Sequence, residues 1–275
     1  MYEYVIIIFI VFFLIPWIYI KIKYPFWSNQ PIFHKYDILR YWTQNPFYIQ
    51  NGFPLKTKFL CDSIGCGEFL DLNEGELDKV IDFIQTHYVE SDKVLTMINK
   101  EDLTSTLSGY SNPSYIGIYK DKQLQQIKKN NETQFEEKEM IVGTITSRAV
   151  KIYMLYSKTI FEEYVYFWDH LSVHRDYIDK NIGRNLIQTL ERYQRINNKS
   201  IQASLFKQES VLCEGVVPLF EYEVHTYPLI NIKRPPMHKF SIQRIVRDNI
   251  HTLSDFLYNI THNITYIPFS LCIFP

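Results

Sequence analysis

The segment between residues 170 and 187, HLSVHRDYIDKNIGRNLI, combines residue types that can bind a charged ligand. A strand is predicted to end at His174, and the turn after it leads into a helix that opens near Gly183. Amides in the first turn of a helix have no partner within the helix, and the helix dipole favours an anion beside them. Asn181 tolerates a left-handed turn, and Gly183 permits close approach of a ligand. Positive charge around the turn comes from Arg175, Lys180 and Arg184. The pattern predicts a cradle for a pyrophosphate, with an ordinary strand-to-helix turn as the alternative.

The helices that must position this segment follow from the spacing of apolar residues. Two are predicted over 73–87 and 99–107, each capped by an asparagine with an acidic residue three positions later. A third is predicted over 181–193. Its apolar face comprises Ile182, Leu186, Ile187 and Leu190, whereas Asn185 and Glu191 are predicted to turn away from the core.

The strands are predicted to be short, and they cover 115–119, 141–147, 150–156, 163–173 and 201–206. Between the first two lies a charged segment, 120–140, which is predicted to be a mobile hairpin loop. Helices, an antiparallel meander, another helix and a last strand predict an α/β layered fold.

The N-terminal segment contains an unbroken apolar run, VIIIFIVFFLIPWIYI, over residues 5–20. With its aromatic neighbours it reaches the length of a membrane-spanning helix. The preceding MYEY has no Lys or Arg and no small-residue cleavage site follows, which argues against a signal peptide. Lys21 and Lys23 follow the run, so we expect an uncleaved anchor with the remaining chain in the cytosol. A signal peptide and a buried helix are the alternatives.

Composition narrows the classes of function. The 275 residues are 46% hydrophobic and 21% charged, which excludes global disorder. A net charge of -1 provides no field that would gather nucleic acid, so no nucleic-acid partner is expected. The cysteines lack the spacing of a zinc site, so no metal is expected either; they are Cys61, Cys66, Cys213 and Cys272.

Three segments resemble the protein N-myristoyltransferases. YPFWSNQPI at 24–32 is similar to the family signature F-W-x-T-Q-P-V, and HYVESD at 87–92 is similar to N-Y-V-E-D-D. The third, 171–187, resembles L-C-V-H-K-x-x-R-x-K-x-x-A-x-x-L-I. Its matching positions are Leu171, Val173, His174, Arg175, Lys180, Leu186 and Ile187. The same turn is similar to motif A of the GNAT acetyltransferase fold, from which Ile178 and Asn181 depart.

The resemblance implies a fold and an activity. The fold would be α/β, a single GNAT-like acyl-CoA N-acyltransferase domain with a mixed central sheet flanked by helices, preceded by one transmembrane helix. The implied boundaries are 1–22 for the anchor, 23–234 for the acyltransferase domain and 235–275 for a C-terminal tail. The implied co-substrate is acyl-CoA, in particular myristoyl-CoA, and the implied acceptor is the N-terminal glycine of a protein or peptide. A short-chain acyltransferase and a non-catalytic, membrane-tethered acyl-CoA-binding protein are the alternatives.

The resemblance also implies site residues. Backbone amides of His170 and Leu171 would form an oxyanion hole, beside which Asp169 could accept the amine proton or be an ordinary strand-edge carboxylate. Residues implied to bind acyl-CoA are Tyr24, Phe26, Trp27, Val173, Arg175, Asp179, Lys180, Asn181, Ile182 and Gly183. An apolar acyl channel could be lined by Tyr164, Phe167, Leu205 and Phe206. Tyr222 and His225 are further candidates for the site. The base is unassigned, because the terminal Pro275 cannot be matched to the family's terminal carboxylate and nothing in the sequence places Asp248 or Asp255 near a thioester.

Overall fold

The computed structural model describes residues 2–35, 48–50, 52–54, 56–88, 98–129, 132–156, 159–207, 216–218, 244–263 and 271–274. The chain divides into two compact units, one formed by 1–152, 162–217 and 273–275, and one formed by 153–161 and 218–272. The first unit carries the sheet and the segments singled out above. In the second, the 3-10 turn η5 (Arg247–Asn249) leads into α6 (Ile250–Asn263). The domain boundaries predicted at 22/23 and 234/235 stay predictions.

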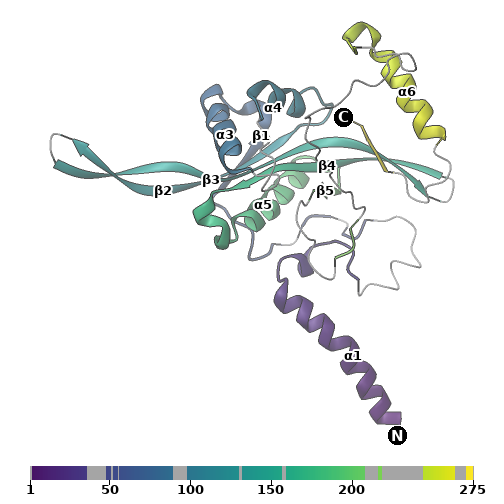
Figure 1. Ribbon diagram of the computed structural model, residues 1–275. Coiled ribbons are helices and arrows are strands. Elements are labelled where there is room, and N and C mark those ends of the chain that lie inside the picture. The colour runs from purple at the N-terminus through teal and green to yellow at the C-terminus, as the bar shows by residue number, and fades with distance from the viewer. Residues whose placement is uncertain are drawn as a thin grey trace, which may run out of the picture. The chain divides into compact units, whose positions relative to one another are not determined.

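The first unit is built around a mixed sheet with the strand order β1-β2-β3-β4-β5 (Figure 1). β1 pairs antiparallel with β2 and β2 with β3, whereas β4 and β5 run parallel. This confirms the predicted α/β class and the mixed sheet. The strands are β1 (Ile64–Glu68), β2 (Tyr115–Lys129), β3 (Glu132–Tyr156), β4 (Thr159–Val173), β5 (Ser204–Phe206) and β6 (Leu271–Phe274).

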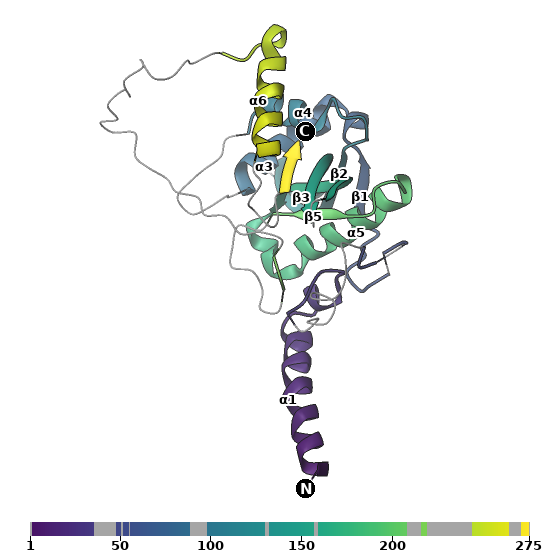
Figure 2. The same cartoon turned by 90° about the vertical axis from the view of Figure 1, so that its right-hand side faces the viewer.

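Helices cover both faces of this sheet (Figures 1 and 2). α5 (Ile182–Asn197) packs on one face, where Leu186 and Leu190 are fully buried against Tyr115 and Ile145. α3 (Glu74–His87) and α4 (Lys100–Leu107) pack on the other face, over Ile116 and Ile118. Short 3-10 turns complete the unit: η1 (Trp27–Asn29), η2 (Phe69–Asp71) and η3 (Arg175–Lys180).

The predicted capping of α3 is confirmed, whereas that of α4 is wrong. Asn73 Oδ1 accepts from the Glu76 amide at 2.9 Å, and Asn73 Nδ2 donates to the Glu76 carboxylate at 3.1 Å. Asn99 precedes α4 but makes no side-chain cap bond. The same residue type therefore caps one helix and merely precedes the other.

The hairpin predicted over 120–140 is confirmed, but its arms are paired strands and not a loop. β2 and β3 continue through it as a long two-stranded ribbon, with register pairs out to Lys129 and Glu132 (Figure 1). Opposite charges face each other across the ribbon, as Lys122 Nζ and Glu137 Oε2 do at 3.6 Å. Cross-strand pairs of opposite charge favour strand pairing, so a charged composition is compatible with an exposed hairpin.

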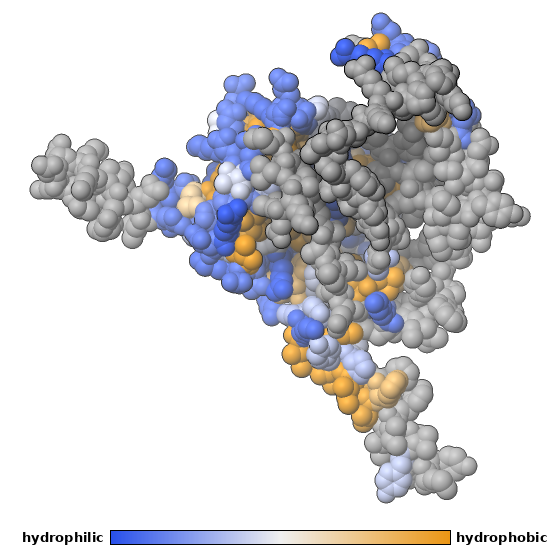
Figure 3. All heavy atoms as spheres, viewed as in Figure 1, coloured by the Kyte–Doolittle hydropathy of each residue, from blue (hydrophilic) through white to orange (hydrophobic). Residues whose placement is uncertain are grey.

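The N-terminal helix α1 spans Tyr2–Lys23, and apolar side chains along it, such as Phe12 and Ile15, are exposed (Figure 3). Within the part of the chain that the structure describes, no helix combines the length and the apolar character that crossing a membrane requires. The predicted transmembrane anchor is therefore unsupported.

Candidate functional site

Strand β4 bears a backbone distortion at the predicted oxyanion hole. His170 has a φ of 50°, a left-handed value that is uncommon for any residue other than glycine. β5 pairs with β4 only over Tyr166–Trp168, so the parallel pairing ends one residue before Asp169. β4 remains in the sheet to Val173, but its pairing with β5 ends before its backbone turns at His170.

Hydrogen bonds fix this distortion. Thr146 on β3 is fully buried, and its hydroxyl donates to the carbonyl oxygen of Asp169 at 3.0 Å and contacts His170 Nδ1 at 2.9 Å. The amide of His170 donates to Asp169 Oδ1 at 2.9 Å. One of the two amides implied for the oxyanion hole therefore holds a carboxylate oxygen of the neighbouring residue. The predicted catalytic roles of Asp169, His170 and Leu171 stay predictions.

The turn after β4 is a compact 3-10 segment, η3, anchored by its one buried residue. Tyr177 is 7% exposed, and its hydroxyl donates to Asp121 Oδ2 at 2.7 Å and accepts from Gln123 Nε2 at 2.9 Å. The ammonium of Lys180 lies 4.0 Å from the centre of the Tyr177 ring. The base of the ribbon therefore holds the turn in place, while Arg175, Asp179 and Lys180 remain exposed.

The start of α5 has the features predicted for an anion cradle. Asn181 adopts a left-handed conformation (φ 60°, ψ 16°), and its side chain does not cap the helix. Its Oδ1 instead accepts a hydrogen bond from Arg184 Nη1 at 2.5 Å. The first turn contains no acidic residue. A Cβ at Gly183 would make only ordinary contacts, the nearest at 3.7 Å from Val173 Cγ2. Uncapped amides with basic neighbours favour an anion, whereas the Ile182 side chain belongs to the core.

A glycine that sequence reasoning missed lies beneath this turn. A Cβ at Gly143 on β3 would lie 2.7 Å from Ile182 Cγ2 and 2.8 Å from Leu186 Cδ1. Real Cβ atoms do not approach other carbons so closely, so α5 can pack here only against glycine. The sequence does contain a signal for this contact: Gly143 lies inside the predicted strand 141–147, and a glycine within a strand often marks the close approach of another element.

The FWSNQP segment packs against α5 and β5. Phe26 is 1% exposed, and its ring meets those of Trp27 and Phe59 edge to face at 4.9 and 5.1 Å. Gln30 Nε2 donates to Gln188 Oε1 on α5 at 2.9 Å. The side chain of Phe26 is thus part of the core. Contact of Tyr24, Phe26 and Trp27 with acyl-CoA stays a prediction.

Aromatic side chains surround β5 at the point where it leaves β4. The Phe206 ring lies 5.8 Å from that of Trp27 and 6.0 Å from that of Trp168. Of the other proposed channel residues, Tyr164 is 40% exposed, while Phe167 and Leu205 are half-buried. The structure therefore places aromatic and apolar side chains on both strands around the end of their pairing.

One predicted orientation on α5 is wrong. Glu191 does not turn away from the core but accepts from Ser204 Oγ and Gln194 Nε2, each at 2.6 Å, and lies 3.5 Å from Arg195. Burial raises the pKa of its carboxyl, and those hydrogen bonds together with the Arg195 charge act in the opposite direction. Gln194 also accepts from Ser147 at 2.8 Å. This polar network joins β3, β5 and the C-terminal half of α5.

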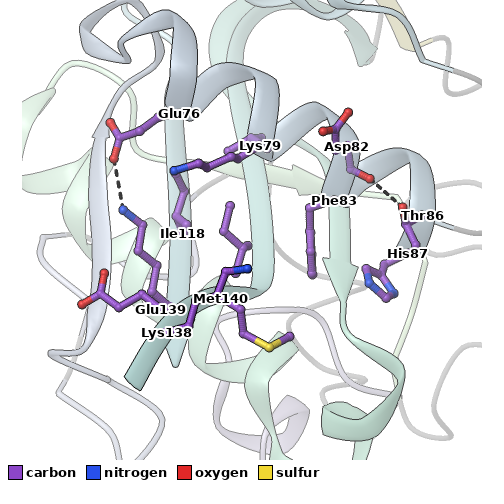
Figure 4. A pocket seen from close by; sticks show the side chains of 13 residues that line it. Glu76, Lys79, Asp82, Phe83, Thr86, His87, Ile118, Lys138, Glu139 and Met140 are labelled. Atoms are coloured by element: carbon purple, nitrogen blue, oxygen red, sulfur yellow. Dashed lines mark hydrogen bonds and ion pairs between the residues drawn. The ribbon is translucent and has the colours of Figure 1, made fainter. Parts of the chain in front are cut away.

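A pocket of about 500 Å³ lies between α3 and the ribbon (Figure 4). Its lining includes Phe83, Met140 and His87, with the Glu76–Lys120 ion pair at 3.0 Å along one edge. The His87 ring lies 4.5 Å from that of His174, and burial, with the His174 and Arg175 charges, lowers the pKa of His87. The pocket therefore extends toward η3, but none of its lining residues belongs to η3 or to the start of α5.

Several candidates cannot be placed beside the cradle. Tyr222, His225, Pro275 and the 89–92 part of HYVESD lie outside the residues that the structure describes. Asp248 and Asp255 belong to the second unit. Tyr88 is described, and its ring lies edge-on to that of His170 at 5.6 Å. Of the described residues in that motif, Tyr88 contacts the distorted strand.

Comparisons with known proteins give structural matches alone. No protein-family model matches the chain, and no curated protein matches it. Two solved structures of Saccharomyces cerevisiae N-myristoyltransferase with bound myristoyl-CoA match with a TM-score of 0.45 each. They are 18% and 17% identical, over 69% and 70% of this chain and 41% and 40% of theirs. A Trypanosoma brucei acetyltransferase matches with a TM-score of 0.31 and 12% identity, over 53% of this chain and 82% of its own.

The chain spans about two-fifths of the length of these N-myristoyltransferase structures.

Proposed function

We propose that this chain is an acyl-CoA-dependent N-acyltransferase. The observation that carries the proposal is the path of the backbone from β4 into α5. Within fifteen residues it presents a distorted strand at His170, an anchored turn and an uncapped helix start. These supply donors for a carbonyl oxygen and for a pyrophosphate, the two anionic centres of an acyl-CoA reaction.

The pyrophosphate would bind at the start of α5. Its amides and the exposed Lys180 and Arg184 provide charge-assisted hydrogen bonds, and the Asn181 conformation aims the turn at the ligand. Arg175, at the start of η3, adds a third positive charge. Because Asn181 does not cap the helix, its side chain does not have to leave these amides before an anion binds.

The thioester would lie beside the distorted part of β4. Attack by an amine turns the carbonyl oxygen into an oxyanion, which backbone amides directed at it stabilise. The His170 amide at present donates to the Asp169 carboxylate, so the thioester oxygen must replace that carboxylate before reaction. Productive binding of acyl-CoA therefore requires the Asp169 carboxylate to leave the His170 amide.

The finer assignment is transfer of a myristoyl group to an N-terminal glycine. It rests on the FWSNQP and HYVESD segments and on the aromatic residues around Phe206. A long acyl chain also offers more binding energy than an acetyl group, since each buried methylene contributes about 0.8 kcal/mol. We therefore expect myristoyl-CoA to bind at least about tenfold more tightly than acetyl-CoA.

Titration calorimetry with CoA, acetyl-CoA and myristoyl-CoA tests this proposal, combined with an assay for thiol release in the presence of a peptide that begins with glycine. Equal affinities for the two acyl-CoAs would favour a short-chain transferase. Tight binding without thiol release would favour the non-catalytic alternative. The contact between Asp169 and the His170 amide is the observation in favour of that alternative, since the carboxylate occupies an oxyanion-hole donor.

The location of the domain on the cytosolic side of a membrane also stays a proposal, based on the apolar run at 5–20 and on Lys21 and Lys23. Fractionation of cells that express the full chain and a chain beginning at residue 24 tests it. Recovery of both with the soluble proteins would rule it out.

A further inference from the structure

The pocket between α3 and the ribbon has an apolar floor. Its volume is about 500 Å³, a size typical of sites that bind small molecules. Phe83 and His87, one turn apart on α3, lie side by side in it, with the Met140 side chain of β3 beneath them (Figure 4). The aliphatic part of the lining comprises Val80, Ile118 and Ile141. A flat, largely apolar ring is the kind of group that this floor accommodates.

The rings of Phe83 and His87 provide a surface for stacking. Their centroids lie 4.6 Å apart at an interplanar angle of 44°. Burial, together with the His174 and Arg175 charges, lowers the pKa of His87, so its imidazole is neutral at pH 7. Nucleobases stack on aromatic side chains of this kind, and a methionine sulfur adds favourable contacts with ring edges. The floor therefore suits a nucleobase.

Two lysines on the rim of the pocket lack an anionic partner. Lys120 forms the 3.0 Å ion pair with Glu76. Lys79 and Lys138 are exposed, and neither forms an ion pair with another residue that the structure describes. An ammonium group binds phosphate through charge-assisted hydrogen bonds. The rim therefore offers the ammonium groups of Lys79 and Lys138 to a phosphate.

Carboxylates on the same rim suit an amino group. Asp82 and Glu139 are exposed, and their oxygens only accept hydrogen bonds when ionised. Inorganic phosphate alone would leave the apolar floor without a partner, whereas an apolar ring alone would not use the lysines. Adenine on a phosphorylated ribose combines the ring, the amino group and the phosphate.

Consecutive contacts through η3 join the pocket to the proposed pyrophosphate cradle. The His87 ring lies 4.5 Å from that of His174, which lies 5.7 Å from that of Tyr177. The ammonium of Lys180 lies 4.0 Å from the centre of the same tyrosine ring. In CoA, a single ribose separates the adenine from the pyrophosphate. A pyrophosphate at the start of α5 therefore places the nucleoside of the same molecule beside η3 and the pocket.

We propose that this pocket binds the 3′-phosphoadenosine end of CoA, with the adenine on Phe83 and His87 and the 3′-phosphate at Lys79 and Lys138; the inference rests on the proposed function. The thioester lies beside β4, the pyrophosphate at the start of α5, and the nucleoside crosses η3 into the pocket. An acyl group carried on protein-bound phosphopantetheine lacks this nucleoside. The pocket thus makes the chain selective for acyl-CoA as the donor.

The test measures the affinity of the full chain for three probes by titration calorimetry. They are CoA, dephospho-CoA, which lacks the 3′-phosphate, and 4′-phosphopantetheine, which lacks the nucleoside. We expect dephospho-CoA to bind about tenfold more weakly than CoA, the scale of a charge-assisted hydrogen bond. Binding of 4′-phosphopantetheine should be weaker again, because the stacked base is lost as well.

Variants assign these differences to the pocket. Lys79→Ser combined with Lys138→Ser should weaken CoA binding about tenfold and leave dephospho-CoA binding unchanged. Lys199→Ser is the matched control, an exposed lysine beyond the far end of α5, and should change neither affinity. Phe83→Leu removes the ring but stays apolar, so it should weaken CoA and dephospho-CoA alike and leave 4′-phosphopantetheine unchanged. Circular dichroism of each variant verifies the fold.

Equal affinities of the wild type for CoA and dephospho-CoA would overturn the inference while the proposed function stands. So would an equal loss of both affinities in the double lysine variant, which would reflect a general change in charge or structure. A Phe83→Leu variant that binds all three probes as the wild type does would contradict the position of the adenine. If the wild-type chain binds neither CoA nor acyl-CoA, the proposed function itself fails, and the nucleoside site with it.

Discussion

Replacing Gly143 by alanine should displace the start of α5 while the sheet itself stays intact. The new Cβ would lie 2.7 Å from Ile182 and 2.8 Å from Leu186, both of which are buried in the core. Carbon atoms pack at about 3.5–4.0 Å, so the start of α5 must move away by roughly 1 Å. Inserting a methyl group into a packed core typically costs about 1–3 kcal/mol.

The larger effect should be on ligand binding, because the displaced turn carries the amides of the proposed cradle. A shift of about 1 Å at a site can cost on the order of 100-fold in activity. Urea unfolding measures the stability of Gly143→Ala, and calorimetry measures its affinity for CoA. Gly67→Ala on β1 is the matched control, since a Cβ there would meet nothing within 4 Å. If Gly143→Ala equals Gly67→Ala in both stability and CoA affinity, the reasoning about the position of α5 is refuted.

Three further changes test other parts of the structure. Lys180→Glu should weaken CoA binding by about 10- to 100-fold, the scale of a charge-assisted hydrogen bond, whereas Lys199→Glu beyond the far end of α5 should leave calorimetric affinity unchanged. The pKa of Glu191 is raised in the folded state, so that state holds the proton more tightly than the unfolded chain. The wild type should therefore lose stability relative to Glu191→Gln as the pH rises above about 4.3, the ordinary glutamate pKa; urea unfolding from pH 4 to 8 that gives a constant difference would contradict this. Burial raises the pKa of the Cys66 thiol to about 12, so iodoacetamide at pH 8 should leave Cys66 unmodified in the native protein and alkylate it after denaturation, as mass spectrometry of peptides can show.

Local signals in the sequence predicted the helices that position the site. Asn73 and Glu76 form the expected reciprocal cap, and the apolar stripe from Ile182 to Leu190 is buried as its spacing requires. α5 begins at Ile182, one residue after the predicted start, because Asn181 adopts the left-handed conformation that its short polar side chain allows. These features depend on residues within a few positions of one another, so a single sequence can reveal them.

Features that depend on distant partners could not be predicted in the same way. Because Glu191 is charged, its side chain is predicted to be exposed, yet hydrogen bonds from Ser204 and Gln194 hold its carboxylate against the core. The positive φ of His170 is accompanied by a contact with the buried Thr146, which lies 24 residues earlier in the sequence. The charged composition of the ribbon predicts a loop. Its strands form because 120–129 aligns with 132–141, and composition does not show that alignment.

The central claim is tested most directly by incubating the full chain with myristoyl-CoA and a peptide that begins with glycine, and by measuring free CoA thiol and acylated peptide together. The account predicts that thiol and myristoylated peptide appear in equal amounts, with the peptide modified at its N-terminal amine. Binding of myristoyl-CoA without formation of either product would contradict it.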